Sequence, residues 1–212
     1  MRVESSKNNI VVLRVDKQYL LASTFLRMQE FYESPEFKDT VIDLEEYMDW
    51  YADEYGNFTY YSDWSGFNVP GQIVRRFFEL HMDTLSKKEA DMYELLLPWI
   101  DDIEKFYVIG VCSDDVMRHE LSHAFYHLET LYKKNMTNLL KQVPKEFKHH
   151  CHRVLQEKGY HPTVFDDECI AYFATNAMPD FVEMFGNAIP WDHMLPIQLA
   201  FEKRYNKFKE KK

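Results

Sequence analysis

The sequence predicts a single α+β domain that is predominantly helical. Most apolar side chains recur three or four positions apart, as on the buried face of a helix, and only a few short segments are rich in β-branched residues. Hydrophobic residues make up 46% of the 212 residues and charged residues 28%, so the chain can bury a core of ordinary size. No internal repeat and no Gly- or Ser-rich linker divides it. We therefore expect one domain over residues 1–212, with a portion of about residues 1–100 packed on the remainder.

The first elements follow from β-branched residues, apolar spacing and capping residues. Asn9–Val15 is apolar and β-branched, which predicts a strand. After Asp16 the apolar side chains are spaced as in a helix that stops before Pro35. Asp43–Glu46 has the pattern of a capping box, which predicts a helix from there toward Tyr55.

The next elements are marked by aromatic and proline residues. Phe58–Tyr61 is aromatic enough to predict a short strand. A helix is expected over about Pro70–Met82, because proline is favoured at the first helical position. A second capping box, over Ser86–Glu89, predicts a helix that reaches about Leu97 and ends at Pro98.

The second half of the chain predicts one strand followed by helices. Glu104–Cys112 is rich in aromatic and β-branched residues and is expected to be a strand. Ser113–Asp115 then supply a cap and negative charge for a helix that continues to about Lys133. Further helices are expected over residues 144–159, 163–177 and 179–185, and from about residue 191.

The net charge of −10 is concentrated in one region. Between Gln29 and Asp63, eleven acidic side chains stand against one base, Lys38. A nucleic-acid-binding groove needs a basic face, so no nucleic-acid partner is expected. Such a charge run is typical of solvated helix faces. The alternative is that the acidic region 29–63 docks a basic partner, which would make the chain a non-catalytic protein-interaction module.

The sequence carries no sign of a membrane or of an oxidising compartment. No segment approaches the roughly 20 apolar residues of a membrane-spanning helix, and the N-terminal residues lack the apolar core of a secretory signal. Cys112, Cys151 and Cys169 are too scattered for a disulfide framework or a cysteine-rich zinc site. We therefore expect a cytoplasmic protein with reduced thiols and no membrane partner; its oligomeric state does not follow from the sequence.

One short motif carries chemistry. His119–His123 reads His-Glu-Leu-Ser-His and matches the His-Glu-x-x-His pattern of zinc peptidases. Residues four apart lie on one helical face, with Cβ atoms about 5–6 Å apart, so both imidazoles can bind one ion. Glu120 can then reach a water held by the metal and act as general base. The motif predicts His119 and His123 as ligands of Zn²⁺ and Glu120 as catalytic. Two alternatives stay open: an amphipathic helix with two partly buried histidines, and a non-catalytic zinc site closed by a fourth protein ligand.

The residues around the motif extend the match. Val116, Leu121, Ser122 and Phe125 fit the longer signature of zinc peptidases, and a predicted strand precedes the helix. Val116–Phe125 thus resembles the active-site helix of the zincins, over about ten residues of the chain. The resemblance implies a zincin-like fold in which the motif helix follows a short strand. It also implies that about residues 101–212 form the metal-binding portion.

A zinc peptidase needs a third protein ligand and leaves the fourth position to water. His127 continues the stripe of His119 and His123, but it lies eight residues from His119, about 12 Å along a helix axis. That is too far to share one ion at a bond length near 2.1 Å. The metzincin pattern also fails, because its glycine and third histidine would fall at Tyr126 and Glu129.

The best candidate for the third ligand is Glu168, because an acid on a second, downstream helix resembles the arrangement in gluzincins. Asp167 and Asp166 compete with it, and one of them could instead orient an imidazole from outside the ligand set. A ligand elsewhere in the chain also remains open. Tyr172, one helical turn after Glu168, could donate a hydrogen bond to the oxyanion of a tetrahedral intermediate.

The segment Tyr60–Pro70 combines aromatic side chains with the Gly, Asn and Pro of turns, which predicts a loop. Trp64 and Phe67 are costly to expose to water. The segment either packs on the core or forms a wall of the substrate cleft, together with three side chains of the first long helix: Arg27, Glu30 and Tyr32.

These motifs predict a zinc-dependent metallopeptidase that acts on a peptide or protein substrate. Glu120 would take a proton from the metal-activated water and deliver it to the leaving amine, and Tyr172 would help to stabilise the oxyanion. Two alternatives stand beside it: the protein-interaction module described above, and an inactive zinc-binding protein of zincin fold.

Overall fold

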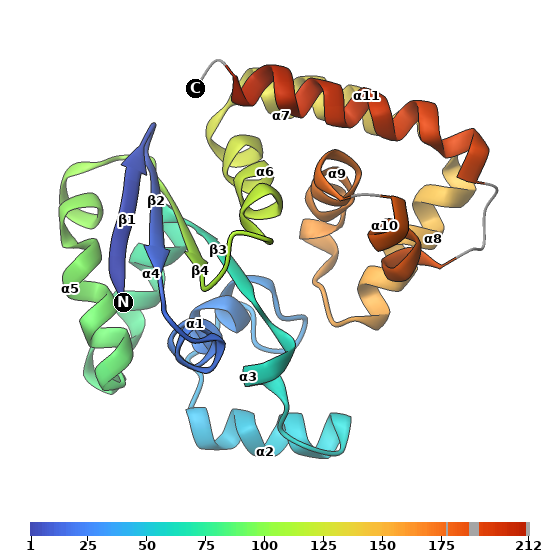
Figure 1. Ribbon diagram of the computed structural model, residues 1–212. Coiled ribbons are helices and arrows are strands. Elements are labelled where there is room, and N and C mark those ends of the chain that lie inside the picture. Colours follow the sequence, from blue (N-terminus) through green and yellow to red (C-terminus); the bar gives the residue numbers. More distant parts are fainter. Residues whose placement is uncertain (177, 187–190, 211–212) are drawn as a thin grey trace. The chain divides into compact units, whose positions relative to one another are not determined.

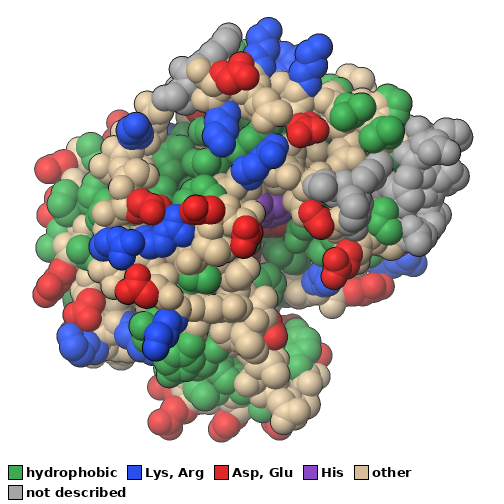
Figure 2. All heavy atoms as spheres, viewed as in Figure 1, with side chains coloured by type: hydrophobic (Ala, Val, Ile, Leu, Met, Phe, Trp, Pro, Cys, Tyr) green, Lys and Arg blue, Asp and Glu red, His purple; other side chains and the backbone are tan. Residues whose placement is uncertain are grey.

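The computed structural model describes residues 1–176, 178–186 and 191–210 (Figure 1, and as spheres in Figure 2). The chain divides into two compact units, Met1–Met117 and Arg118–Lys212, which we call the N-terminal and C-terminal units. The N-terminal unit combines helices with a four-stranded sheet, and the described part of the C-terminal unit is helical. The α+β, predominantly helical class is thus confirmed. The expected single domain, with portions meeting near residue 100, stays a prediction.

The sheet has strand order β1-β2-β4-β3. β1 (Arg2–Lys7) and β2 (Ile10–Arg14) form an antiparallel hairpin. Its turn residues Asn8 and Asn9 have φ angles of 52° and 63°, in the left-handed region that asparagine tolerates well. β2 runs parallel to β4 (Tyr107–Val111), and β3 (Gly66–Pro70) is antiparallel to β4. A parallel pair requires a long crossover, which the helices between β2 and β4 provide. The strands expected around β2 and β4 are confirmed.

The N-terminal unit contains five helices, two of which begin at capping residues that the sequence predicts. They are α1 (Gln18–Glu33), α2 (Leu44–Tyr55), α3 (Tyr60–Asp63), α4 (Gly71–His81) and α5 (Lys87–Asp102), with a 3₁₀ turn over Met82–Thr84. The Asp43 side chain accepts from the backbone N–H groups of Glu45 and Glu46, and Ser86 and Glu89 form the reciprocal capping box of α5. Gly56 ends α2 at a φ of 87°, a conformation that glycine adopts without strain.

Three local expectations are wrong. Tyr60–Asp63 is helical, so residues 58–61 do not form the expected strand, and a strand that was not expected lies at Gly66–Pro70. Pro98 does not end α5, which continues to Asp102. The helix expected up to Lys133 stops at Leu128, because Glu129 has an extended conformation with φ −116° and ψ 97°. In each case, packing or backbone conformation beyond the local pattern decided the outcome.

The segment Tyr60–Pro70 is therefore not a loop but a short helix and a strand. Tyr60 and Phe67 are both 1% exposed, and the Phe67 ring stacks on Phe25 of α1 at a centroid distance of 5.3 Å. The segment thus packs on the core, as one of the two alternatives held. Phe25 also lies against Gly110 in β4, where a Cβ atom would come within 2.6 Å of the ring. Glycine at this position allows the helix to approach the sheet.

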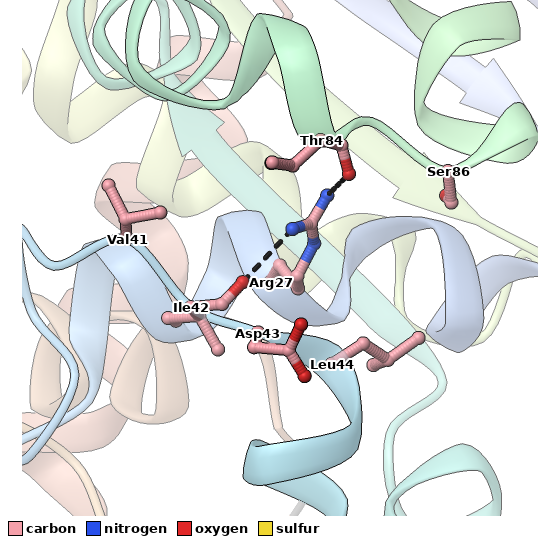
Figure 3. Close-up of a pocket in the computed structure, with 7 residues that line it drawn as sticks. All are labelled: Arg27, Val41, Ile42, Asp43, Leu44, Thr84 and Ser86. Atoms are coloured by element: carbon pink, nitrogen blue, oxygen red, sulfur yellow. Dashed lines mark hydrogen bonds between the residues drawn. The ribbon is translucent and has the colours of Figure 1, made fainter.

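A buried ion pair ties α1 to α5. Arg27 donates to both carboxylate oxygens of Glu89, at 2.9 and 2.6 Å, and to the backbone carbonyls of Ile42 and Thr84. Figure 3 shows its guanidinium between the start of α2 and the segment leading to α5, beside a hollow of about 190 Å³. The guanidinium of Arg27 is engaged in these contacts within the N-terminal unit. The expectation that Arg27 lines a substrate cleft stays a prediction.

The C-terminal unit is a cluster of helices around α9. It comprises α6 (Met117–Leu128), α7 (Thr130–Leu140), α8 (Lys145–Glu157), α9 (Phe165–Thr175), α10 (Met178–Phe185) and α11 (Trp191–Lys209), with a 3₁₀ turn over Pro162–Val164. α9 contacts α7, α8 and α11 (Figure 1). Phe173 of α9 stacks on Phe201 of α11 at a centroid distance of 5.0 Å. The helix expected over 163–177 is thus α9; its last expected residue, Ala177, lies outside the described residues.

Among the described residues, no helix is both long enough and apolar enough to cross a lipid bilayer.

Candidate metal centre

Helix α6 carries the motif residues on its buried side. His119 and His123 are four positions apart, and their ring centroids lie 4.8 Å from each other. Ser122, between them, is fully buried and is hydrogen-bonded to the Tyr132 hydroxyl of α7 at 2.9 Å. The serine thus fixes the helix to its neighbour.

Helix α9 brings the acidic side chains. His161 caps the preceding 3₁₀ turn by accepting from the backbone N–H of Thr163, and α9 starts directly after that turn. Asp166, Asp167 and Glu168 all lie in its first turn, where the helix dipole favours negative charge. Two of these carboxylates, those of Asp167 and Glu168, contact the histidines of α6.

Three of these side chains converge on one point. His119, His123 and Glu168 each offer a ligand atom, and these atoms all lie within 4.8 Å of one another. The Nε2 atom of His119 is 3.6 Å from one oxygen of Glu168, and the Nε2 atom of His123 is 3.5 Å from the other. Two ligands at 2.1 Å from a tetrahedral ion are separated by about 3.4 Å. The spacing therefore fits a zinc-sized ion between the imidazoles and the carboxylate.

The polar atoms at this point lack hydrogen-bond partners. His123 Nε2 and Glu168 Oε2 are both buried, and neither makes a hydrogen bond. A buried polar atom without a partner costs roughly 1–3 kcal/mol. A cation placed among the three side chains would satisfy both atoms, so the residues present fit a metal ion. The identity of the metal does not follow from the geometry alone.

The negative charge of the carboxylates around the site also favours a cation. Burial by itself lowers the pKa of His123, but the carboxylates of Asp167, Glu168 and Glu120 reverse this and raise it to about 10. Burial would likewise raise the pKa of Asp167, but the imidazoles of His123 and His127 hold it below its ordinary value. Without a metal, a proton on His123 partly balances these acids; a divalent ion would balance them more fully.

Glu120 and Tyr172 both interact with residues of this group. Glu120 is 5% exposed, and its charge acts on both His123 and Tyr172. The Tyr172 ring packs edge-on against His119, at a centroid distance of 4.6 Å. Burial and the charge of Glu168 raise the pKa of Tyr172, so its hydroxyl stays protonated and can donate. Tyr160 is a hydrogen-bonding neighbour of that hydroxyl, which the sequence gave no reason to expect.

The three candidate ligands differ in their exposure to solvent. The His119 side chain is 19% exposed, whereas His123 and Glu168 are 2% and 4% exposed. Within the described part of the chain, no fourth His, Cys, Asp or Glu joins this group. A metal held here would have three protein ligands among the described residues, which is the number that catalytic zinc sites use.

The competing acids have other partners. Asp166 pairs with Lys148 at 2.8 Å and with His152 at 3.1 Å. Asp167 lies 3.1 Å from Nδ1 of His123, in the orienting position that the sequence left open for it. His127 lies outside the three-residue group and contacts Asp167 at 3.3 Å. This last contact was missed, because nothing local in the sequence links residue 127 to residue 167.

Comparisons with protein-family models, with curated proteins and with solved structures found no match to this chain.

Proposed function

We propose that this protein is a zinc-dependent metallopeptidase whose metal is held by His119, His123 and Glu168. The observation that carries the proposal is the convergence of these three ligand atoms within 4.8 Å of one another. Two neutral imidazoles and one carboxylate form a ligand set found in zinc hydrolases. The zincin-like arrangement implied by the motif helix belongs to this proposal.

A Zn²⁺ ion bound here would act as a Lewis acid toward a water molecule and toward the carbonyl group of a substrate. The protein supplies the proton transfers. Glu120 is next in sequence to His119, and its carboxylate is the base that accepts the proton of the attacking water. The same carboxyl group then gives the proton to the leaving amine.

Tyr172 would assist at the oxygen of the substrate carbonyl. Its ring stands beside His119, and its hydroxyl remains protonated. A neutral hydroxyl donates a hydrogen bond that becomes stronger as negative charge develops on that oxygen. Tyr160 would limit the rotation of the Tyr172 hydroxyl through its own contact with it.

The metal part of the proposal is tested by zinc content. We expect one zinc ion per chain in untagged protein, and its loss in a Glu168→Gln variant, because an amide is a much poorer ligand than a carboxylate. His149 is exposed on α8, so His149→Ala serves as the matched control and should keep its zinc. If the parent protein contains no zinc after incubation with the metal, the assignment of the ligands is wrong.

The catalytic part is tested by Glu120→Gln. This variant should keep the zinc, because Glu120 is not among the three ligands, and should lose at least about 100-fold in the rate of peptide hydrolysis, the typical contribution of a general base. A mixture of unstructured peptides, analysed by mass spectrometry, is the substrate. Equal cleavage by parent and variant would show that the assigned base is wrong. Zinc binding with no cleavage by the parent would favour the inactive zinc-binding alternative.

A further inference from the structure

Helices α6 and α9 face each other through an alternating row of imidazoles and carboxylates. From one end to the other, the row consists of His119, Glu168, His123, Asp167 and His127. The successive contacts measure 3.6, 3.5, 3.1 and 3.3 Å. Three imidazoles one helical turn apart on α6 thus alternate with two consecutive acids on α9.

The two halves of this row differ. In the half that contains Glu168, the separations are those of ligands around an ion, and His123 Nε2 and Glu168 Oε2 have no hydrogen-bond partner. In the half that contains Asp167, the nitrogen–oxygen distances are near hydrogen-bond length, and both imidazoles contact the same oxygen, Oδ2. The first half fits a metal, and the second half connects His127 to a metal ligand.

The contact with Asp167 fixes the state of His123. A carboxylate only accepts hydrogen bonds, so Nδ1 of His123 must carry the proton that it shares with Asp167. Nε2 then faces Glu168 with its lone pair available when the imidazole is neutral. The orientation of the ligand atom therefore depends on how firmly Asp167 is held.

Asp167 is held by few groups. Its side chain is 8% exposed, so water contributes little, and its other oxygen, Oδ1, is buried without a hydrogen-bond partner. The two imidazoles hold the Oδ2 atom from successive turns of α6. Removal of His127 would leave this oxygen with His123 alone, and the carboxylate could then rotate away from it.

We propose that His127 is a positioning residue for the metal centre: it donates from Nε2 to Asp167, which in turn orients His123 toward the metal. This inference rests on the zinc site proposed above. It assigns His127 a role that is neither metal ligand nor surface residue. Groups that orient a ligating histidine typically change metal affinity 10–100-fold when they are removed.

The experiment compares His127→Leu, which removes the donor, with His127→Gln, whose amide can donate from a similar reach. Zinc affinity is measured by competition with a chelator, and the ligand geometry is followed by the absorption spectrum of the Co²⁺-substituted protein. We expect His127→Leu to bind zinc about 10-fold or more weakly and to show an altered Co²⁺ spectrum. His127→Gln should keep most of the zinc affinity and a Co²⁺ spectrum close to that of the parent. His149 is exposed on α8, so His149→Leu should match the parent in both measurements.

The outcomes separate this inference from the proposed function. If the parent binds zinc and His127→Leu has the same affinity and the same spectrum, the positioning role is wrong while the zinc site stands. If His127→Leu and His127→Gln are weakened equally, residue 127 acts by packing and not as a donor, which also overturns the inference. If the parent protein binds no zinc, the proposed function itself fails.

Discussion

Breaking the buried Arg27–Glu89 pair should destabilise the N-terminal unit strongly. In Arg27→Met, the Glu89 carboxylate loses both guanidinium contacts while it stays buried, and the carbonyls of Ile42 and Thr84 lose their donor. Leaving one partner of a buried ion pair alone costs about 3–5 kcal/mol. For a chain of this size, each kcal/mol lowers the melting temperature by roughly 2–4 °C, so the expected loss is about 6–20 °C.

The matched variant combines Arg27→Met with Glu89→Gln. It removes both charges, and the amide oxygen can still accept from the backbone N–H of Ser86, which donates to Glu89 at 2.7 Å in the parent. The double variant should therefore be more stable than Arg27→Met alone, as shown by urea denaturation and thermal melting followed by circular dichroism. Two results would refute this reasoning: a loss of less than about 1 kcal/mol in Arg27→Met, or a double variant that is less stable than Arg27→Met. Either would show that the pair does not act by neutralising a buried charge.

Two further predictions concern the N-terminal unit. Gly110→Ala places a Cβ atom 2.6 Å from the Phe25 ring and should cost about 1–3 kcal/mol by overpacking, measured by urea denaturation; a further Phe25→Leu substitution should recover part of the loss. Burial lowers the pKa of His81 below 6.5, so the unfolded state takes up more protons there and the free energy of unfolding should fall as the pH drops below about 6.5. His81→Phe removes this titration and should flatten the slope; parallel curves for parent and variant between pH 7.5 and 5.5 would contradict it.

Several features that depend on neighbouring residues were predicted correctly. The strand around Ile10–Arg14 follows from its β-branched residues, and the capping box of Ser86 and Glu89 involves residues three positions apart. The shared face of His119 and His123 follows from the helical repeat alone. In all these cases, the interacting groups lie within one turn or one strand of each other.

Features that depend on long-range packing were not decided by the sequence. The pattern allowed a helix to end at Pro98 and to run through Glu129, and the structure has the opposite in both places. The sequence could rank Glu168 above Asp167 and Asp166 only through the resemblance to gluzincins. The contacts of α9 with α6 now place Glu168 at the imidazoles, Asp167 behind His123, and Asp166 at Lys148.

By itself, the sequence determined the helical character of the chain, the strands around β2 and β4, and the two imidazoles and one adjacent acid of α6, because each is set by contacts within a few residues. Only the tertiary structure decided that an acid on α9 completes this group, and that His127 meets Asp167. The reason is physical: the approach of two helices about 40 residues apart in the chain depends on how all the side chains between them pack, and no local pattern records it.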